Sequence, residues 1–192
     1  MEDSKKLKKE DLTQRLDRHL DWIKSCDTKA SIVIAGAGVF LSIFTAEHSI
    51  SILNQILSKT LQNMNFSNFI YLAAFLYCWG RFAYGAYCLI RVLIPMMKND
   101  LLLFKEGTRE DSLYYFESSV DDKKYFEFKK KMLEETEEEE VEDLLSQVYI
   151  NAKICSSKYK FYKKGISHTF IGIAGILILY VIGIIVLKLG GI

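Results

Sequence analysis

Residues Ile166–Leu187, with the sequence ISHTFIGIAGILILYVIGIIVL, contain no Asp, Glu, Lys or Arg and are almost purely aliphatic. A helix that crosses a bilayer needs about 20 consecutive apolar residues and tolerates few charges. This segment meets both requirements. It therefore predicts a transmembrane helix, and it decides the fold class of the chain as that of an integral membrane protein.

Two other apolar segments precede it. Residues Ser31–Ala46 (SIVIAGAGVFLSIFTA) are short for a membrane span, so a span and a buried core helix are both open interpretations. Their Gly36 and Gly38 are small residues that suit close packing between helices. Residues Phe69–Ile94 are long enough for a tilted span and end at Pro95, the only proline, which cannot donate the next helical hydrogen bond.

Basic residues between the apolar segments predict the orientation of the chain. Residues 1–30 contain eight Lys and Arg and residues 97–164 contain thirteen, whereas residues 47–68 contain Lys59 alone. Lys and Arg stay preferentially on the cytoplasmic side of a membrane. The N-terminus and the long middle segment are therefore predicted to be cytoplasmic, and the 47–68 connection and the C-terminal tail external. The same asymmetry favours a span over a core helix for the first segment.

Together these features predict an all-α integral membrane protein of the bacterial inner membrane, with three transmembrane helices and a cytoplasmic helical segment between the second and third. Segregation of apolar from charged residues is what a bilayer demands of a chain. The predicted parts are a cytoplasmic N-terminal amphipathic helix (1–30), transmembrane helix 1 (31–46), an external amphipathic connection (47–68), transmembrane helix 2 (69–94), the cytoplasmic helical segment (95–165), transmembrane helix 3 (166–187) and an external tail (188–192).

The cytoplasmic segment contains a sharp helix start. Thr136 and Glu139 have the spacing of a capping box, and the acidic residues around them would lie at the positive end of a helix dipole. In residues 141–162, apolar side chains recur at spacings of four and three, which predicts a heptad seam. The seam suits packing against a helix at residues 12–23 or a homo-oligomeric coiled coil. We expect this helix to continue directly into the third span.

Charged residues in or beside the apolar segments are candidates for function. Asp27 and Lys29 place two opposite charges at the membrane edge, where the preceding helix is expected to stop or bend around Ser25 and Asp27. Arg81 lies near the middle of the second span, where a charge costs at least about 2.5 kcal/mol. Two interpretations are open for Arg81. It faces a polar bundle interior or pore, or it snorkels to an interface.

No motif predicts catalysis. The sequence has no nucleophile and base at a known spacing, no Gly-rich phosphate loop and no His-rich ligand set. We therefore expect no enzyme, no catalytic residue, no metal site and no cofactor.

A candidate ligand contact is the stretch REDSLYYF at residues 109–116. It joins the cation Arg109 to the aromatic side chains of Tyr114, Tyr115 and Phe116, a combination able to stack a base and contact a phosphate. Aromatic residues near a membrane also serve as interfacial anchors, so this second interpretation is open as well.

Several short motifs together resemble the transmembrane effectors of the Pycsar antiphage systems, and related membrane effectors occur in cGAS-like cyclic-oligonucleotide defence. The motifs are DTKAS from Asp27, LYYF from Leu113, the helix with Tyr125, and DLLSQVY from Asp143 followed by Lys158 and Tyr159 before the last span. The resemblance covers the chain from about residue 12 to residue 187. One departure is that Glu117 and Ser118 follow LYYF, where we would expect a glycine soon after the aromatics.

The resemblance implies that a partner cyclase, switched on by phage, makes a cyclic nucleotide such as cyclic UMP or cyclic CMP. The effector then damages the inner membrane, and the infected cell stops growing or dies before phage mature, which is abortive infection. The resemblance adds Gln147 and Lys158 to the candidate ligand contacts. We expect a homo-oligomer in contact with membrane lipids and no nucleic acid polymer as partner. A different class of function is also open, a membrane-anchored interaction module that recruits a soluble partner without forming a pore.

Overall fold

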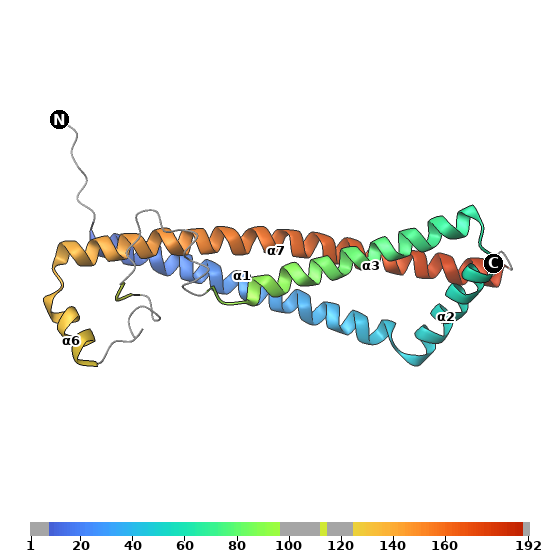
Figure 1. Cartoon of the computed structure of the whole chain (residues 1–192), viewed down its shortest axis with the longest axis horizontal. Helices are drawn as coiled ribbons and strands as arrows, with labels where there is room; N and C mark the ends of the chain where they lie inside the picture. The colour runs from blue at the N-terminus through green and yellow to red at the C-terminus, as the bar shows by residue number, and fades with distance from the viewer. Residues whose placement is uncertain (1–7, 97–111, 115–124, 190–192) are drawn as a thin grey trace, which may run out of the picture. The chain divides into compact units, whose positions relative to one another are not determined.

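A computed structural model describes residues 8–96, 112–114 and 125–189, and every regular element within them is a helix (Figure 1). The helices are α1 (Lys9–Phe44), α2 (Glu47–Gln62), α3 (Phe66–Leu93), α6 (Tyr125–Glu134) and α7 (Glu137–Lys188). The prediction of an all-α fold is confirmed for these residues. The chain divides into two compact units, one of residues 1–26 and 94–159 and the other of residues 27–93 and 160–192.

The first unit combines the start of α1, helix α6 and the first part of α7. Leu12 of α1 and the α7 residues Leu144 and Ile150 are buried in it. The Nζ atom of Lys9 lies 2.6 Å from the Oε1 atom of Glu140, which forms an ion pair. The first turn of α1 is thereby joined to the first turn of α7.

Helix α7 begins where the capping box predicts. The backbone N–H of Glu139 donates to Thr136 Oγ1 at 3.3 Å, and the backbone N–H of Thr136 donates to Glu139 Oε2 at 2.8 Å. Two amide groups that a helix start leaves without partners are thus satisfied. The helix then continues for 52 residues without interruption, as expected.

The predicted heptad seam in residues 141–162 is only partly buried within the chain, where Cys155 is buried, and a homo-oligomeric seam stays a prediction. Leu145 and Tyr159, two members of that seam, are 43% and 38% exposed. The buried side of α7 instead carries Leu144 and Ile150 together with polar residues. An apolar spacing rule cannot identify a helix face whose buried positions are partly polar, which explains why the buried side of α7 departs from the seam.

The second unit has an aromatic core built by three helices. Ala37 and Phe44 of α1, Phe75 and Phe82 of α3, and Ile176 of α7 form its buried cluster. Phe44 meets two further aromatic rings edge to face, with ring centroids 5.7 Å from Trp79 and 5.3 Å from Tyr180. Such edge-to-face pairs stabilise a core by about 0.5–1.5 kcal/mol beyond the area they bury.

Glycines allow α3 and α7 to approach closely within this unit. A Cβ atom added at Gly172 would lie 2.6 Å from the backbone nitrogen of Phe82, and one at Gly85 would lie 2.4 Å from the backbone nitrogen of Thr169. Both distances are far below a van der Waals contact with backbone atoms, which have little freedom to shift. Small residues at helix crossings are typical of membrane proteins, where close backbone packing drives association.

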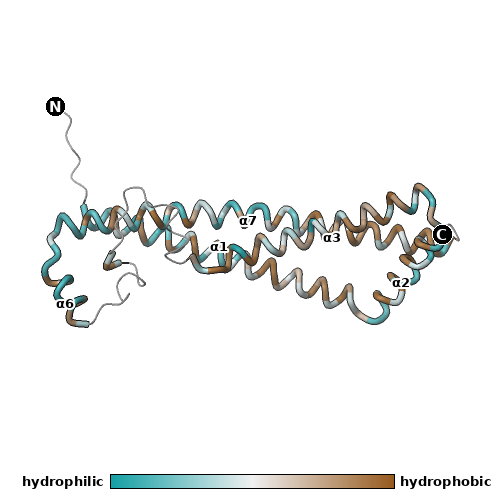
Figure 2. The backbone as a smooth tube through the Cα atoms, in the orientation of Figure 1, coloured by the Kyte–Doolittle hydropathy of each residue, from teal (hydrophilic) through white to brown (hydrophobic). Residues whose placement is uncertain are grey.

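Two helices, α1 and α7, are long and apolar enough to cross a membrane by length and composition. Helix α3 has 28 residues but is not among them, because Tyr, Trp, Gly and Arg residues interrupt its aliphatic positions. Figure 2 shows hydrophobic residues gathered in the second part of α1 and the last part of α7, whereas the first part of α7 is largely hydrophilic. The sequence predicts three transmembrane helices. Two of them meet the requirements of length and composition among the described residues, and a span by α3 stays a prediction.

Large apolar side chains of the second unit are strongly exposed in all three of its long helices. Burial of apolar side chains gives no stabilisation where the surrounding solvent is lipid, whereas a large exposed apolar patch is unfavourable in water. This surface fits a hydrocarbon environment. Its most exposed members include Ile32, Val39, Ile43, Phe66, Phe69, Leu76, Phe170, Ile178 and Ile185.

The expected stop near Ser25 and Asp27 is wrong, because α1 continues through both residues to Phe44. Helix α3 begins after Asn65, whose Oδ1 accepts the backbone N–H of Asn68 at 2.8 Å as an N-cap. It ends at Leu93, two residues before Pro95, as the proline predicts.

Hydroxyl groups in the apolar helices are satisfied in two ways. Ser31, Ser42 and Thr45 each donate to the backbone carbonyl four residues earlier in α1, at 2.7–3.0 Å. Two tyrosines donate to carbonyl oxygens of other helices instead. Tyr71 bonds Leu179 at 2.9 Å, and Tyr180 bonds Ser49 at 3.4 Å.

Candidate functional site

The first unit contains a buried polar face on α7. Asp143 has no exposed surface, and Gln147, one turn later, is 4% exposed. Ser146 is also buried, and Lys158 is 5% exposed. Charged residues are almost never fully buried without partners, because removing a charge from water is costly. A polar face of this kind therefore marks a candidate site.

Asp143 is bonded through only one of its two carboxylate oxygens. Its Oδ2 accepts the backbone N–H of Leu113 at 2.8 Å. The Oδ1 atom is buried and has no hydrogen-bond partner in the part of the chain that the structure describes. Next to Leu113, the Oγ of Ser112 accepts the backbone N–H of Tyr114 at 3.1 Å, which shapes residues 112–114 as a turn. Asp143 therefore fixes this turn and still offers one free acceptor.

Tyr114 and Lys9 share one carboxylate oxygen of Glu140. The Tyr114 hydroxyl donates to Glu140 Oε1 at 2.7 Å, beside the ion pair with Lys9. Hydrogen bonds from Lys9 and then Tyr114 lower the pKa of Glu140, whereas burial and then the bond to Glu140 raise the pKa of Tyr114. Because the folded pKa of Glu140 is lowered, the contact stabilises the fold fully above the ordinary carboxyl pKa of 4.5. This stabilisation is lost as pH falls from 4.5 through the lowered pKa of the folded state.

The structure describes three of the six predicted ligand contacts. Tyr114, Gln147 and Lys158 all belong to the first unit, and Gln147 and Lys158 are both buried residues of α7. Arg109, Tyr115 and Phe116 lie outside the described residues. Gln147 is eleven positions before Lys158, which separates the two residues by about 16 Å along the helix axis. One small ligand would therefore not contact both residues near their backbones.

Asp143 was missing from the predicted ligand contacts. The signal that could have identified it is its position four residues before Gln147, which places both side chains on one side of the helix.

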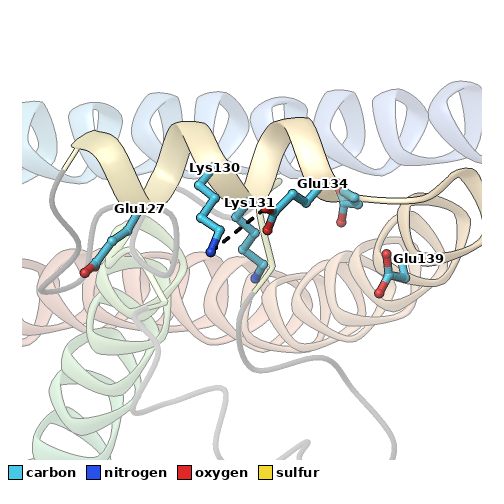
Figure 3. Close-up of a pocket in the computed structure, with 6 residues that line it drawn as sticks. Glu127, Lys130, Lys131, Glu134 and Glu139 are labelled. Carbon is cyan, nitrogen blue, oxygen red and sulfur yellow. Dashed lines mark ion pairs between the residues drawn. The ribbon is translucent and has the colours of Figure 1, made fainter.

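A separate open cavity of about 350 Å³ lies where α6 meets the start of α7 (Figure 3). Its lining contains more carboxylates than ammonium groups, and the nearest approach between Lys130 and Glu134 is a weak ion pair of 3.9 Å. The excess negative charge opposes the binding of a phosphate. We therefore do not place a nucleotide there. The lining residues are Glu127, Lys130, Lys131, Glu134, Glu135 and Glu139.

Arg81 lies in α3 of the second unit. One of its terminal nitrogens donates to the hydroxyl of Tyr77 at 2.9 Å, and its guanidinium carbon lies 5.7 Å from the centre of the same ring. Its Nε is buried without a hydrogen-bond partner among the described residues. Asp27 and Lys29 lie within α1, where Asp27 is half-buried and Lys29 is exposed. The positions of Asp27 and Lys29 assign no function to either residue.

The described residues contain no group of three His, Cys, Asp or Glu side chains that could hold a metal ion.

Comparison with known proteins places the chain in a family. The family model described as the Pycsar effector protein domain matches residues 11–187. A Pycsar effector protein of Gulbenkiania mobilis, GmPycTM, is 30% identical over 172 residues, which is 83% of this chain and 84% of that relative. No solved structure matches the chain. Both matches cover most of the chain, which confirms the resemblance inferred from its motifs. The chain therefore belongs to the family of Pycsar effector proteins, which act in antiphage defence.

Proposed function

We propose that this protein is an inner-membrane effector that a cyclic nucleotide activates to disrupt the membrane and cause abortive infection. The observation that carries the proposal is the family match across both units of the chain. The first unit supplies a buried polar face for a ligand, and the second supplies the apolar surface for a bilayer. Cyclic UMP and cyclic CMP, made by a partner cyclase, are the proposed activators.

Activation requires that the ligand favour one arrangement of the helices over another, because equal affinity for both shifts nothing. Helix α7 runs from Glu137 to Lys188 without a break and contributes to both units. A change in the packing of its first part therefore has a continuous hydrogen-bonded path toward the apolar part. Neither a cofactor nor a catalytic step is needed for this function.

The purified full-length protein in vesicles is the direct test of nucleotide dependence. We expect cyclic UMP or cyclic CMP to release a potential set across the vesicle membrane, because ligand binding shifts the helices. Linear UMP and CMP are the matched controls, since they carry the same bases without the cyclic phosphate. Release of equal extent without any nucleotide would contradict the proposal and favour a constitutive toxin.

We also propose three spans, with α3 as the second, an N-terminus in the cytoplasm and a C-terminus outside. The distribution of basic residues supports this topology. A reporter fused after Ile192 is expected outside, and a reporter inserted near Glu110 is expected inside. An external reporter near Glu110 would rule out the arrangement.

A second candidate function is a membrane-anchored module that recruits a soluble partner. The observation that favours it is α6, whose Tyr125, Phe126 and Leu133 side chains are largely exposed. Helix α6 would then be the contact surface. Activity of the purified protein in vesicles without any added protein would exclude recruitment as the cause of membrane damage.

A further inference from the structure

The unpaired oxygen of Asp143 has a chemical requirement that the described residues leave unmet. Oδ1 has no partner among the described residues, although Oδ2 is bonded to the Leu113 N–H. An unsatisfied buried acceptor destabilises a fold by the desolvation that it suffers without compensation. Buried polar groups without partners are rare in proteins, and each calls for an explanation such as a ligand.

The neighbouring side chain completes a two-point contact. Gln147 follows Asp143 by one helical turn, so their Cβ atoms lie about 5–6 Å apart on the same side of α7. The backbone carbonyl of Gln147 accepts a hydrogen bond from the side-chain amide of Asn151 at 2.9 Å. Its side-chain amide can donate through nitrogen. Asp143 and Gln147 together therefore offer an acceptor beside a donor.

We propose that Asp143 and Gln147 recognise the edge of a pyrimidine base, with Asp143 Oδ1 accepting an N–H and Gln147 donating to the adjacent acceptor. This inference rests on the proposed function and names the part of the activating nucleotide that the site contacts. Uracil presents such a pair as N3–H and O4, and cytosine presents it as the N4 amine and N3. A carboxylate that accepts from a base is a strong contact in a buried setting.

The same geometry couples recognition to a structural change. Asp143 is fully buried, so a base reaches Oδ1 only if the groups that cover this side chain move. The 112–114 turn is bonded to the other oxygen of the same carboxylate. Tyr114 of that turn is bonded to Glu140 in the first turn of α7. A base at Oδ1 would therefore act on the carboxylate that holds the turn, about one helical turn from the Glu140 contacts with Tyr114 and Lys9.

The variant that tests the proposal is Asp143→Asn. Its amide oxygen can still accept the Leu113 N–H, which keeps the structural contact, but its other group becomes a donor. The readout is the nucleotide concentration that releases half of the vesicle membrane potential, measured with the nucleotide that activates the wild type more strongly. We expect this concentration to rise at least about ten-fold. Because either base presents an N–H to Asp143 in the proposed contact, the responses to cyclic UMP and to cyclic CMP should both weaken.

Glu142→Gln is the matched control, since Glu142 is the exposed neighbour and loses the same charge. It should keep both the sensitivity and the nucleotide ratio of the wild type. An unchanged half-maximal nucleotide concentration in Asp143→Asn, beside a responding wild type, would overturn the inference and leave the proposed function standing. A wild type that responds to neither nucleotide would overturn the proposed function and this inference with it.

A measurement on the wild-type chain avoids any question of whether a variant folds. Binding of 3-methyl cyclic UMP or of N4,N4-dimethyl cyclic CMP is compared with binding of the parent nucleotide, using whichever parent the protein binds. Methylation removes the N–H that Asp143 accepts, so binding should weaken at least about ten-fold. Equal binding of the parent and its methylated form would contradict a contact between the base N–H and Asp143.

Discussion

Gly172→Ala will destabilise the packing of α3 against α7 by about 2–3 kcal/mol, because an added methyl group overpacks a tight core. The new Cβ would lie 2.6 Å from the Phe82 backbone nitrogen and 2.7 Å from its Cα. No side-chain rotation can relieve contacts with backbone atoms, so the two helices must separate. The edge-to-face contacts that surround Phe82 would be loosened together with them.

The effect is measured as thermal unfolding of the detergent-solubilised protein and as the quantity of protein in the membrane fraction. Gly36→Ala is the matched control, since Gly36 is also a helical glycine and a Cβ there would meet no atom within 4 Å. It should be neutral or slightly stabilising, because alanine favours a helix by about 1 kcal/mol over glycine. Equal stability of the two variants would show that the close approach of α3 and α7 is not required.

Arg81→Leu will abolish membrane depolarisation while leaving the quantity of inserted protein equal to or above that of the wild type. With α3 as the proposed second span, a charge near its middle costs at least about 2.5 kcal/mol in hydrocarbon, so removal of the charge should not impair insertion. The hydroxyl of Tyr77 satisfies only part of the guanidinium, and its Nε stays buried without a partner among the described residues. A polar interior of an assembled bundle would supply the remaining acceptors.

Membrane-fraction protein and depolarisation must be measured on the same cells, because only their combination separates the two interpretations of Arg81. Arg91→Leu is the matched control, since Arg91 lies in the last turn of the same helix and its guanidinium stacks over Phe161. It should keep depolarising activity. Full depolarisation by Arg81→Leu at normal abundance would mean that Arg81 only snorkels to an interface.

Much of the fold was predictable because its local signals are strong. The capping box at Thr136, the proline at position 95 and the aliphatic segment from Ile166 each predict a boundary or a helix by local chemistry. The continuation of α1 through Asp27 was not predictable in the same way. A polar residue that by itself favours a helix end can still adopt helical geometry when the residues on both sides of it are helical.

The candidate site was only partly predictable, because its burial is a tertiary property. Gln147 and Lys158 were identified through the family motif, but Asp143 was not, since sequence patterns assign acidic residues to a solvated face. Hydropathy alone would predict a buried Leu145 and an exposed Asp143, but the structure shows the reverse. Its complete burial and its contact with Leu113 distinguish this aspartate from the exposed Glu142 beside it.

The hydroxyl bonds within α1 have a consequence for the biogenesis of the protein. Ser31, Ser42 and Thr45 are satisfied by carbonyls of their own helix, so these groups need no hydrogen-bond partner from a later segment when the helix meets lipid. Tyr71 and Tyr180 find their carbonyl partners on other segments, and those bonds can form only after the last helix has left the ribosome. Insertion of the first helix and final assembly are thus separable stages in time.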